Sequence, residues 1–164
     1  MKPEYLHAIF NRVPVFGVGL GIFALILALL LKSRSAQIAA LAVVLVSSAS
    51  AYPVLFPGQQ DYKSVRGPAD EPGQRWLDVH MERAESTIYI YYALMLVAGV
   101  ALAVPKWKPK TAVPLTLAIL VLAAASMGVG GWISYAGGQV QHPEFRDGPL
   151  PAAVEARHQH APHD

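Results

Sequence analysis

Residues 13–31 read VPVFGVGLGIFALILALLL, a run of nineteen residues without a charged side chain or a histidine. An α-helix rises ~1.5 Å per residue, so this run would extend about 28 Å, close to the thickness of the hydrocarbon core of a bilayer. A secretory signal peptide would have a shorter apolar core and a cleavage site, whereas Lys32-Ser33-Arg34 follows directly here. The run therefore predicts a transmembrane helix.

Three further apolar runs lie at residues 36–55, 87–104 and 112–134, and none of them contains Asp, Glu, Lys, Arg or His. The third run is slightly short for a span, but three tyrosines at its start are typical of an interfacial aromatic belt. The hydrophobic fraction of 54% is high for an ordinary soluble domain, and the apolar residues are bunched. The predicted fold is all-α: a transmembrane four-helix bundle in a single membrane domain, residues 1–146.

The segment 56–86 separates the second and third spans and contains PGQQDYKSVRGPADEPGQRWLDVH. Its glycines and prolines predict a turn-rich first half. From Gly73 onward the spacing of apolar residues predicts a short amphipathic helix that continues into the third span. After Arg146 the chain is rich in Pro, Ala and His, so residues 147–164 are expected to form a disordered, His-rich tail.

Four spans would place the N-terminus, the 56–86 loop and the C-terminal tail on one membrane face, called side A. The short turns 32–35 and 105–111 would lie on the opposite face, side B, and they hold five of the basic residues in about eleven positions. Lys and Arg near the spans favour the cytoplasmic face, so side B is expected to be cytoplasmic. The remaining eight of the 13 basic residues lie on side A, but over a much longer stretch. The prediction is a multi-pass protein of the bacterial inner membrane with both termini in the periplasm.

Three histidines, His7, His80 and His142, stand just outside three of the apolar runs, and the four-span topology places all of them on side A. Asn11 is four residues after His7, so the two side chains would share one face of the first helix. Side B has no histidine. The sequence therefore predicts a shared polar site at one surface of the bundle.

Carboxylates accompany two of these histidines. Glu82 and Glu85 follow His80 and are three residues apart, so they can approach the same side of a helix. Glu144 follows His142, beyond a Gly137-Gly138 pair that is expected to end the fourth helix. Up to three imidazoles and three carboxylates from separate segments would then meet at the mouth of the bundle.

Such a set contains the ligand types of a divalent metal ion, and the candidate metal ligands are His7, His80, His142, Glu82, Glu85 and Glu144. Two of the histidines could instead be axial ligands of one b-type haem, with His7, His80, His142 and Asn11 as the cofactor-binding residues. A quinone pocket is a third option. The simpler alternative is that each imidazole caps a helix end or lies among the lipid headgroups, since no local ligand motif is present.

Other functions are less compatible with the composition. Because the spans carry no ionisable residue, the sequence argues against an ion pump or ion-coupled transporter. With no cysteine, the chain has no disulfide, thiol nucleophile or Cys-ligated zinc. The basic residues are not gathered on one face, so nucleic-acid binding has little support.

The residues KPEYLHAIFNRVPV at positions 2–15 resemble the opening motif of a family of bacterial four-span membrane proteins of unknown function. The start of the third span, His80-x-Glu82-x-Ala84, and the closing segment 137–144, GGQVQHPE, are similar to later motifs of that family. In the family the third-span histidine is often followed directly by Glu, whereas Met81 intervenes here. Related membrane domains are fused to Rieske iron–sulfur domains, so the resemblance implies proximity to respiratory or redox chains.

Two functional hypotheses follow. The first is an integral membrane protein whose side A site binds a metal ion or a b-type haem in redox or metal handling. The second is a non-catalytic scaffold or accessory subunit of a larger membrane redox complex, embedded in the lipid bilayer. An enzyme is less expected, because no nucleophile stands beside the carboxylates in the sequence.

Overall fold

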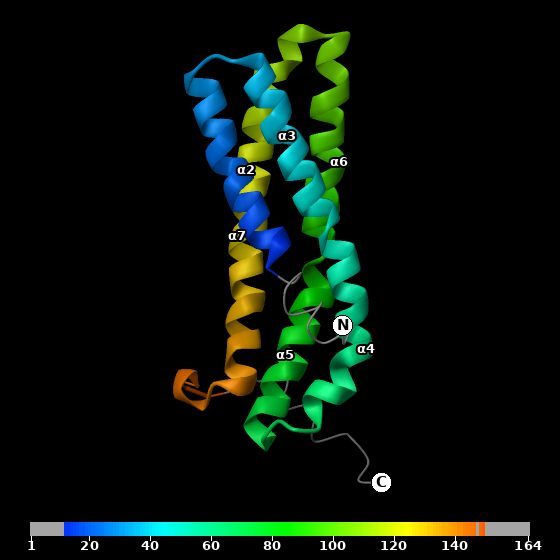
Figure 1. The fold of residues 1–164 in the computed structure, drawn as a ribbon, viewed down its shortest axis with the longest axis vertical. Coiled ribbons are helices and arrows are strands. Elements are labelled where there is room, and N and C mark those ends of the chain that lie inside the picture. The colour runs from blue at the N-terminus through cyan, green and yellow to red at the C-terminus, as the bar shows by residue number, and fades with distance from the viewer. Residues whose placement is uncertain (1–11, 147, 150–164) are drawn as a thin grey trace.

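The computed structural model describes residues 12–146 and 148–149, and within these ranges the chain is helical, with no strand (Figure 1). Four helical segments are long and apolar enough to cross a membrane: Val13–Leu30, Arg34–Val54, Glu71–Lys106 and Pro109–Gln141. The prediction of an all-α four-helix bundle is therefore confirmed.

Helices α2 (Val13–Leu30), α3 (Arg34–Ala49), α6 (Tyr89–Ala103) and α7 (Ala112–Gln141) form the apolar part of the bundle. Helix α2 packs against α3 and α7, and α6 packs against the same two neighbours. In the short turn between α2 and α3, the Ser33 hydroxyl caps α3 by accepting from the Ala36 amide at 3.3 Å. Two 3-10 turns, Val104–Lys106 and Pro109–Thr111, join α6 to α7 at the same end.

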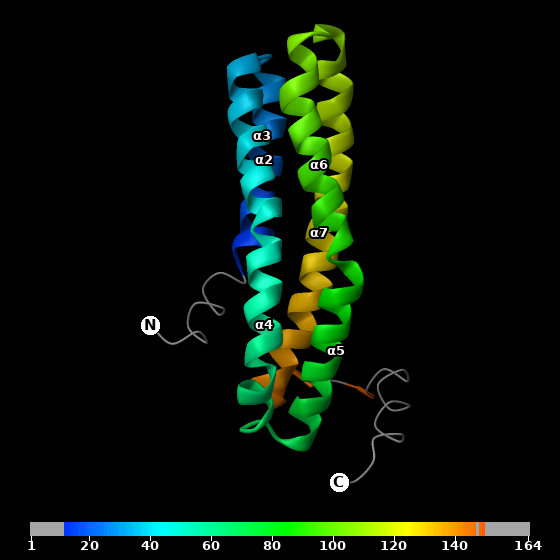
Figure 2. The ribbon, with the colours of Figure 1, turned by 90° about the vertical axis from the view of Figure 1, so that its right-hand side faces the viewer.

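Helices α4 (Ala51–Arg66) and α5 (Glu71–Thr87) prolong α3 and α6 toward side A, with breaks at Ser50 and Ile88 (Figure 2). The expectation that α5 continues into the third span is confirmed. The expectation of a turn-rich first half of the 56–86 loop is wrong, because α4 is helical through to Arg66. Packing of α4 against α5 overrides the local turn preference of Pro and Gly.

The fourth helix also runs further than expected. The sequence predicts that Gly137-Gly138 ends it, but α7 continues through both glycines to Gln141. Gly137 serves a close approach instead, because a Cβ there would lie 3.0 Å from the His80 Nδ1 atom. With α4 and α5, this C-terminal part of α7 forms a three-helix extension beyond the apolar spans, which we call the side A extension.

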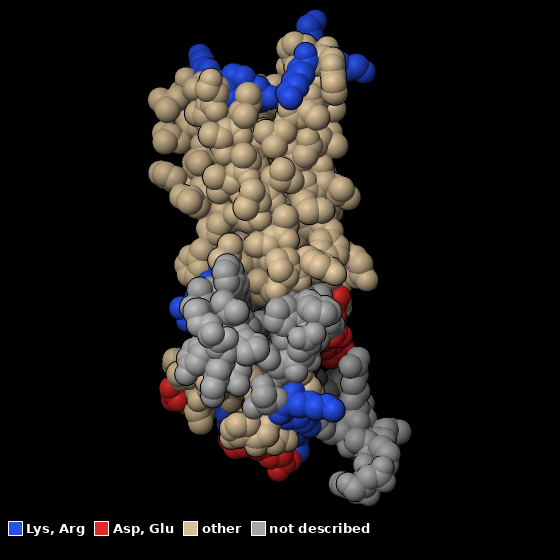
Figure 3. All heavy atoms as spheres, turned by 45° about the vertical axis from the view of Figure 1, so that its right-hand side comes forward, with Lys and Arg blue, Asp and Glu red and all other residues tan. Residues whose placement is uncertain are grey.

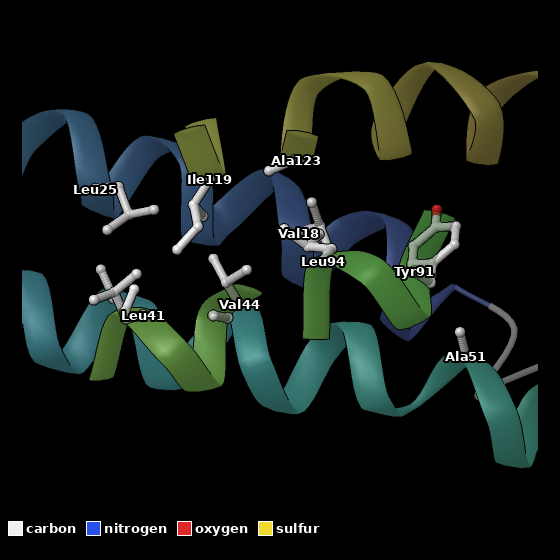
Figure 4. Packing of buried hydrophobic residues seen from close by; sticks show 12 residues of the cluster. Val18, Leu25, Leu41, Val44, Ala51, Tyr91, Leu94, Ile119 and Ala123 are labelled. Atoms are coloured by element: carbon white, nitrogen blue, oxygen red, sulfur yellow. The ribbon is translucent and has the colours of Figure 1, made fainter. Parts of the chain in front are cut away.

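The core of the spans is built from interlocking aliphatic and small residues (Figure 4). The fully buried members are contributed by all four helices: Val18, Leu25, Leu41, Val44, Leu94, Ala98, Ile119 and Ala123. Gly130 is buried where a Cβ would lie 2.4 Å from the Tyr91 hydroxyl, and that hydroxyl donates to the Ser126 carbonyl at 3.0 Å. The small residues Ser126 and Gly130 thus serve packing within the chain.

The outer surface of the spans is apolar. Figure 3 shows a band without charged residues. At the end formed by the two short turns the charged residues in view are Lys and Arg, whereas the opposite end carries acidic residues together with further Lys and Arg. Large aliphatic and aromatic side chains on this band are more than 60% exposed: Phe16, Leu20, Phe23, Leu30, Leu96 and Val121. An exposed apolar belt of this extent suits lipid rather than water, so the chain is a multi-pass membrane protein.

A candidate polar site on the side A extension

His80 lies at the contact between α5 and α7, just beyond the apolar spans. Its ring is half-buried, and its Nδ1 atom is 3.0 Å from the carbonyl oxygen of Ile133. A carbonyl can only accept a hydrogen bond, so Nδ1 carries the proton, and in the neutral ring Nε2 carries the lone pair. Gly137 allows this approach, since any side chain at position 137 would meet the imidazole.

Arg83 is three residues after His80 and is buried against the same helix, with 9% of its surface exposed. Its Nη1 atom donates to the Trp132 carbonyl at 2.7 Å, and its Cζ atom lies 4.2 Å from the centroid of the Trp132 ring. His80 and Arg83 therefore bind successive carbonyls of α7. These two contacts fix the register of α5 on α7.

A third link joins the far ends of the same two helices. Arg146 donates to both carboxylate oxygens of Asp70, at 2.5 and 2.8 Å, and to the carbonyls of Gln139 and Val140 at 2.7 and 2.9 Å. Asp70 also caps α5 by accepting from the Gly73 amide at 3.1 Å. The Arg146 guanidinium, and to a smaller extent the Gly73 amide, lowers the pKa of Asp70. We call this set of contacts the Asp70–Arg146 clasp.

Helix α4 is tied to α5 by a smaller network. Asp78 accepts from the Tyr62 hydroxyl and from the Arg66 guanidinium, which also donates to the Tyr62 oxygen at 2.7 Å. Burial, followed by the nearby Asp78 carboxylate, raises the pKa of Tyr62. The side A extension is thus held by polar links from α4 to α5 and from α5 to α7, over a small core of Trp76, Leu77, Val79, Ala136 and Val140.

His142 lies at the C-terminal end of α7 and is exposed. Its Nδ1 atom is 2.9 Å from the Glu144 carboxylate, and its ring centroid is 5.2 Å from that of Phe145. Hydrogen bonding to its own backbone, followed by the His142 bond, lowers the pKa of Glu144. This pair is local to the chain end. His80 contacts α7 at Gly137, five residues earlier, which corresponds to about 7.5 Å along a helix axis.

The structure brings together only part of the predicted set. Within the described residues, no three His, Cys, Asp or Glu side chains gather closely enough to hold a metal ion. Glu82 is half-buried and Glu85 is exposed on α5. His7 and Asn11 lie outside the described residues, as does most of the 147–164 tail. A shared site of the three histidines stays a prediction.

Sequence reasoning missed Arg83, Arg146 and Gln139. Arg83 has a usable signal, since its spacing of three from His80 places both on one helix face. Arg146 follows the last turn of a helix, where basic side chains often bind carbonyls. Gln139 has no such signal in the sequence. In the structure its Oε1 atom is buried and lacks a hydrogen-bond partner in the described part of the chain.

The fold and these contacts define a four-span membrane protein with a braced polar extension on one side. Comparison with family models, with curated proteins and with solved structures finds no match to this chain.

Proposed function

We propose that this protein lies in the bacterial inner membrane and binds a metal ion or a b-type haem through His80, at its periplasmic end, for redox or metal handling. The hydrogen bond from His80 Nδ1 to the Ile133 carbonyl carries the proposal. Histidines that bind metals through one ring nitrogen usually donate the other N–H to a carbonyl or carboxylate, which fixes the tautomer and the ring orientation.

The surroundings of His80 fit this role. The ring is half-buried between two packed helices, so its orientation is set before any ligand binds. His7 and His142 are the candidates for further nitrogen ligands. A bound iron or other metal would supply the redox or Lewis-acid chemistry, and the chain would supply its ligands and a rigid frame.

The orientation rests on the basic residues. Lys32 and Arg34 flank one short turn, and three lysines lie in the other, at the end of the apolar band opposite the acidic residues (Figure 3). The positive-inside tendency then directs this end to the cytoplasm and His80 to the periplasm.

The test is the absorption spectrum and metal content of the protein purified in mild detergent. The proposal expects either a Soret band that shifts on reduction or one metal ion bound per chain. Protein that shows neither, after expression with haem precursor and with metal supplied, would contradict it.

The bracing of the side A extension favours a second function, that of an accessory subunit in a larger membrane redox complex. Arg83, Arg146 and Asp78 each join two helices, so the extension presents a rigid surface outside the apolar band. Pre-organised surfaces bind partners with a smaller entropic cost. This function predicts co-purification with a larger complex in mild detergent and loss of that complex on gene deletion. A chain that runs alone in blue native electrophoresis, with the complex intact in its absence, would contradict it.

A further inference from the structure

We propose that Arg83 and Trp132 form a binding site for the phosphodiester group of an anionic phospholipid in the side A leaflet. This site is independent of any metal or haem at His80. It rests on the charge balance of Arg83, on the depth of the two residues and on the aromatic surface beside them.

Arg83 is a buried cation without a counter-charge from the described residues. The ion pairs of the described part of the chain involve Arg66, Arg75, His142 and Arg146, and none includes Arg83. Its bond to the Trp132 carbonyl and its position over the indole ring supply partial negative charge only. A largely desolvated guanidinium gains most from a full negative charge, so an external anion would stabilise it.

The guanidinium is also still open to a ligand. It has five N–H donors, and within the described residues one of them, on Nη1, forms a hydrogen bond. Among the described residues, the Oε1 atom of Gln139 is the single buried side-chain polar atom that lacks a partner. Arg83 keeps 9% of its surface exposed, and none of its nitrogens is among the buried atoms without a partner in the described residues, so a remaining N–H can donate to a phosphate oxygen at the surface.

The depth of the pair matches that of lipid headgroups. Trp132 is twenty residues after Ala112, at the start of α7, which corresponds to about 30 Å along the helix and thus to the thickness of the hydrocarbon core. Arg83 precedes the apolar helix α6 by about one and a half turns. Both residues therefore lie at the side A interface, where phosphates are found.

The aromatic surface favours a lipid over free phosphate. Trp132 and Tyr135 are 50% and 51% exposed on the outside of α7, and Tyr135 packs edge-on against Trp76 at 6.0 Å. Tryptophan and tyrosine rings prefer the headgroup region, where acyl chains and glycerol cover their apolar faces. Planar guanidinium groups bind phosphate oxygens in pairs, and basic sites between helices recognise anionic lipids.

The first experiment measures lipid retention by native mass spectrometry of protein in detergent with added phosphatidylglycerol. Arg83→Gln is expected to lower lipid retention about fivefold, which corresponds to the loss of the binding contribution of one basic residue near the membrane surface. Arg75→Gln is the matched control, because Arg75 lies on the same helix but pairs with Glu71, and it should retain lipid as the wild type does. Equal retention by Arg83→Gln and wild type would overturn the proposal. Displacement of the lipid by inorganic phosphate at about 10-fold excess over lipid would also overturn it.

A second experiment leaves Arg83 unchanged, so it holds even where Arg83→Gln fails to fold. Trp76→Phe with Trp107→Phe leaves Trp132 as the single tryptophan. Brominated phosphatidylglycerol should quench its fluorescence more than brominated phosphatidylcholine at equal mole fraction, because the zwitterionic headgroup offsets the phosphate charge. Equal quenching by the two lipids would overturn the assignment to an anionic lipid.

Discussion

Arg146 binds Asp70 through two hydrogen bonds across 76 positions of the chain, and each residue also caps a helix. Asp70 accepts from the first turn of α5, while Arg146 donates to the last carbonyls of α7. One ion pair thus closes the N-terminal end of one helix onto the C-terminal end of another, and charge at both ends agrees with the helix dipoles. This clasp sets the outer limit of the side A extension.

The clasp predicts a loss of stability in acid. The folded-state pKa of Asp70 is lowered from its ordinary value of 3.8, so its contribution is present above about pH 4 and is lost as the pH falls through the folded pKa. Asp70→Asn should lower the thermal unfolding temperature at pH 7 and remove part of its decline below pH 4. The measurement is thermal unfolding followed by circular dichroism in mild detergent.

Glu71→Gln is the matched control for this effect, because it removes an exposed ion pair with Arg75 on the same helix. Exposed pairs of this kind contribute little to stability. Equal unfolding temperatures of Asp70→Asn and Glu71→Gln across the whole pH range would show that the clasp does not stabilise the folded state.

Gly73→Ala should destabilise the extension. A Cβ at position 73 would lie 2.5 Å from the Val140 carbonyl oxygen and 2.6 Å from the Asp70 Oδ1 atom, so the two helix ends must separate. Overpacking of this kind costs about 1–3 kcal/mol. Gly67→Ala is the control, because its Cβ would make an ordinary contact of 3.6 Å with the Lys63 carbonyl oxygen. Chemical denaturation of both variants measures the difference, and equal free energies of unfolding would contradict the close approach at Gly73.

The neighbouring glycines of α7 should behave differently. Gly138→Ala meets nothing within 4 Å and should stabilise the helix by about 0.5–1 kcal/mol. Gly137→Ala presses on the His80 ring and should lengthen the bond from Nδ1 to the Ile133 carbonyl. Nuclear magnetic resonance of the protein with ¹⁵N-labelled histidine should show a displaced Nδ1 signal in Gly137→Ala alone. Identical spectra of the two variants would contradict the contact.

The orientation can be tested by labelling, because the chain contains no cysteine. Glu71→Cys lies on side A and Lys108→Cys on side B, and both positions are exposed. In cells with a permeabilised outer membrane, a membrane-impermeant maleimide should label Glu71→Cys and reach Lys108→Cys only after lysis. The reverse pattern would place side A in the cytoplasm.

The spans could be predicted from the sequence because each apolar run is long enough to satisfy its own backbone in lipid. The side A extension could not. The residues of α4 contain Pro57 and Gly58, which favour turns locally. The helix is linked to the packed α5 through Tyr62 and Arg66. Tertiary contacts therefore determine that this segment is helical.

The candidate site was predicted in part. Topology placed His80 and His142 on one side, but it could not show that His80 turns toward a carbonyl of α7 while His142 pairs with Glu144. The sequence predicts a helix end at Gly137, but glycine serves both helix termini and close approaches, and one sequence does not separate the two uses. The contact between Arg83 and Trp132 could not be predicted, because the sequence does not show that α5 packs against α7.

We propose His80 as the residue through which the protein holds a metal ion or haem. The most direct measurement compares His80→Ala with His142→Ala, purified side by side and examined for Soret absorption and metal content, with circular dichroism to confirm folding. We expect His80→Ala to lose the bound group and His142→Ala, which changes an exposed residue, to lose less of it. A folded His80→Ala protein with the same spectrum and metal content as the wild type would contradict it.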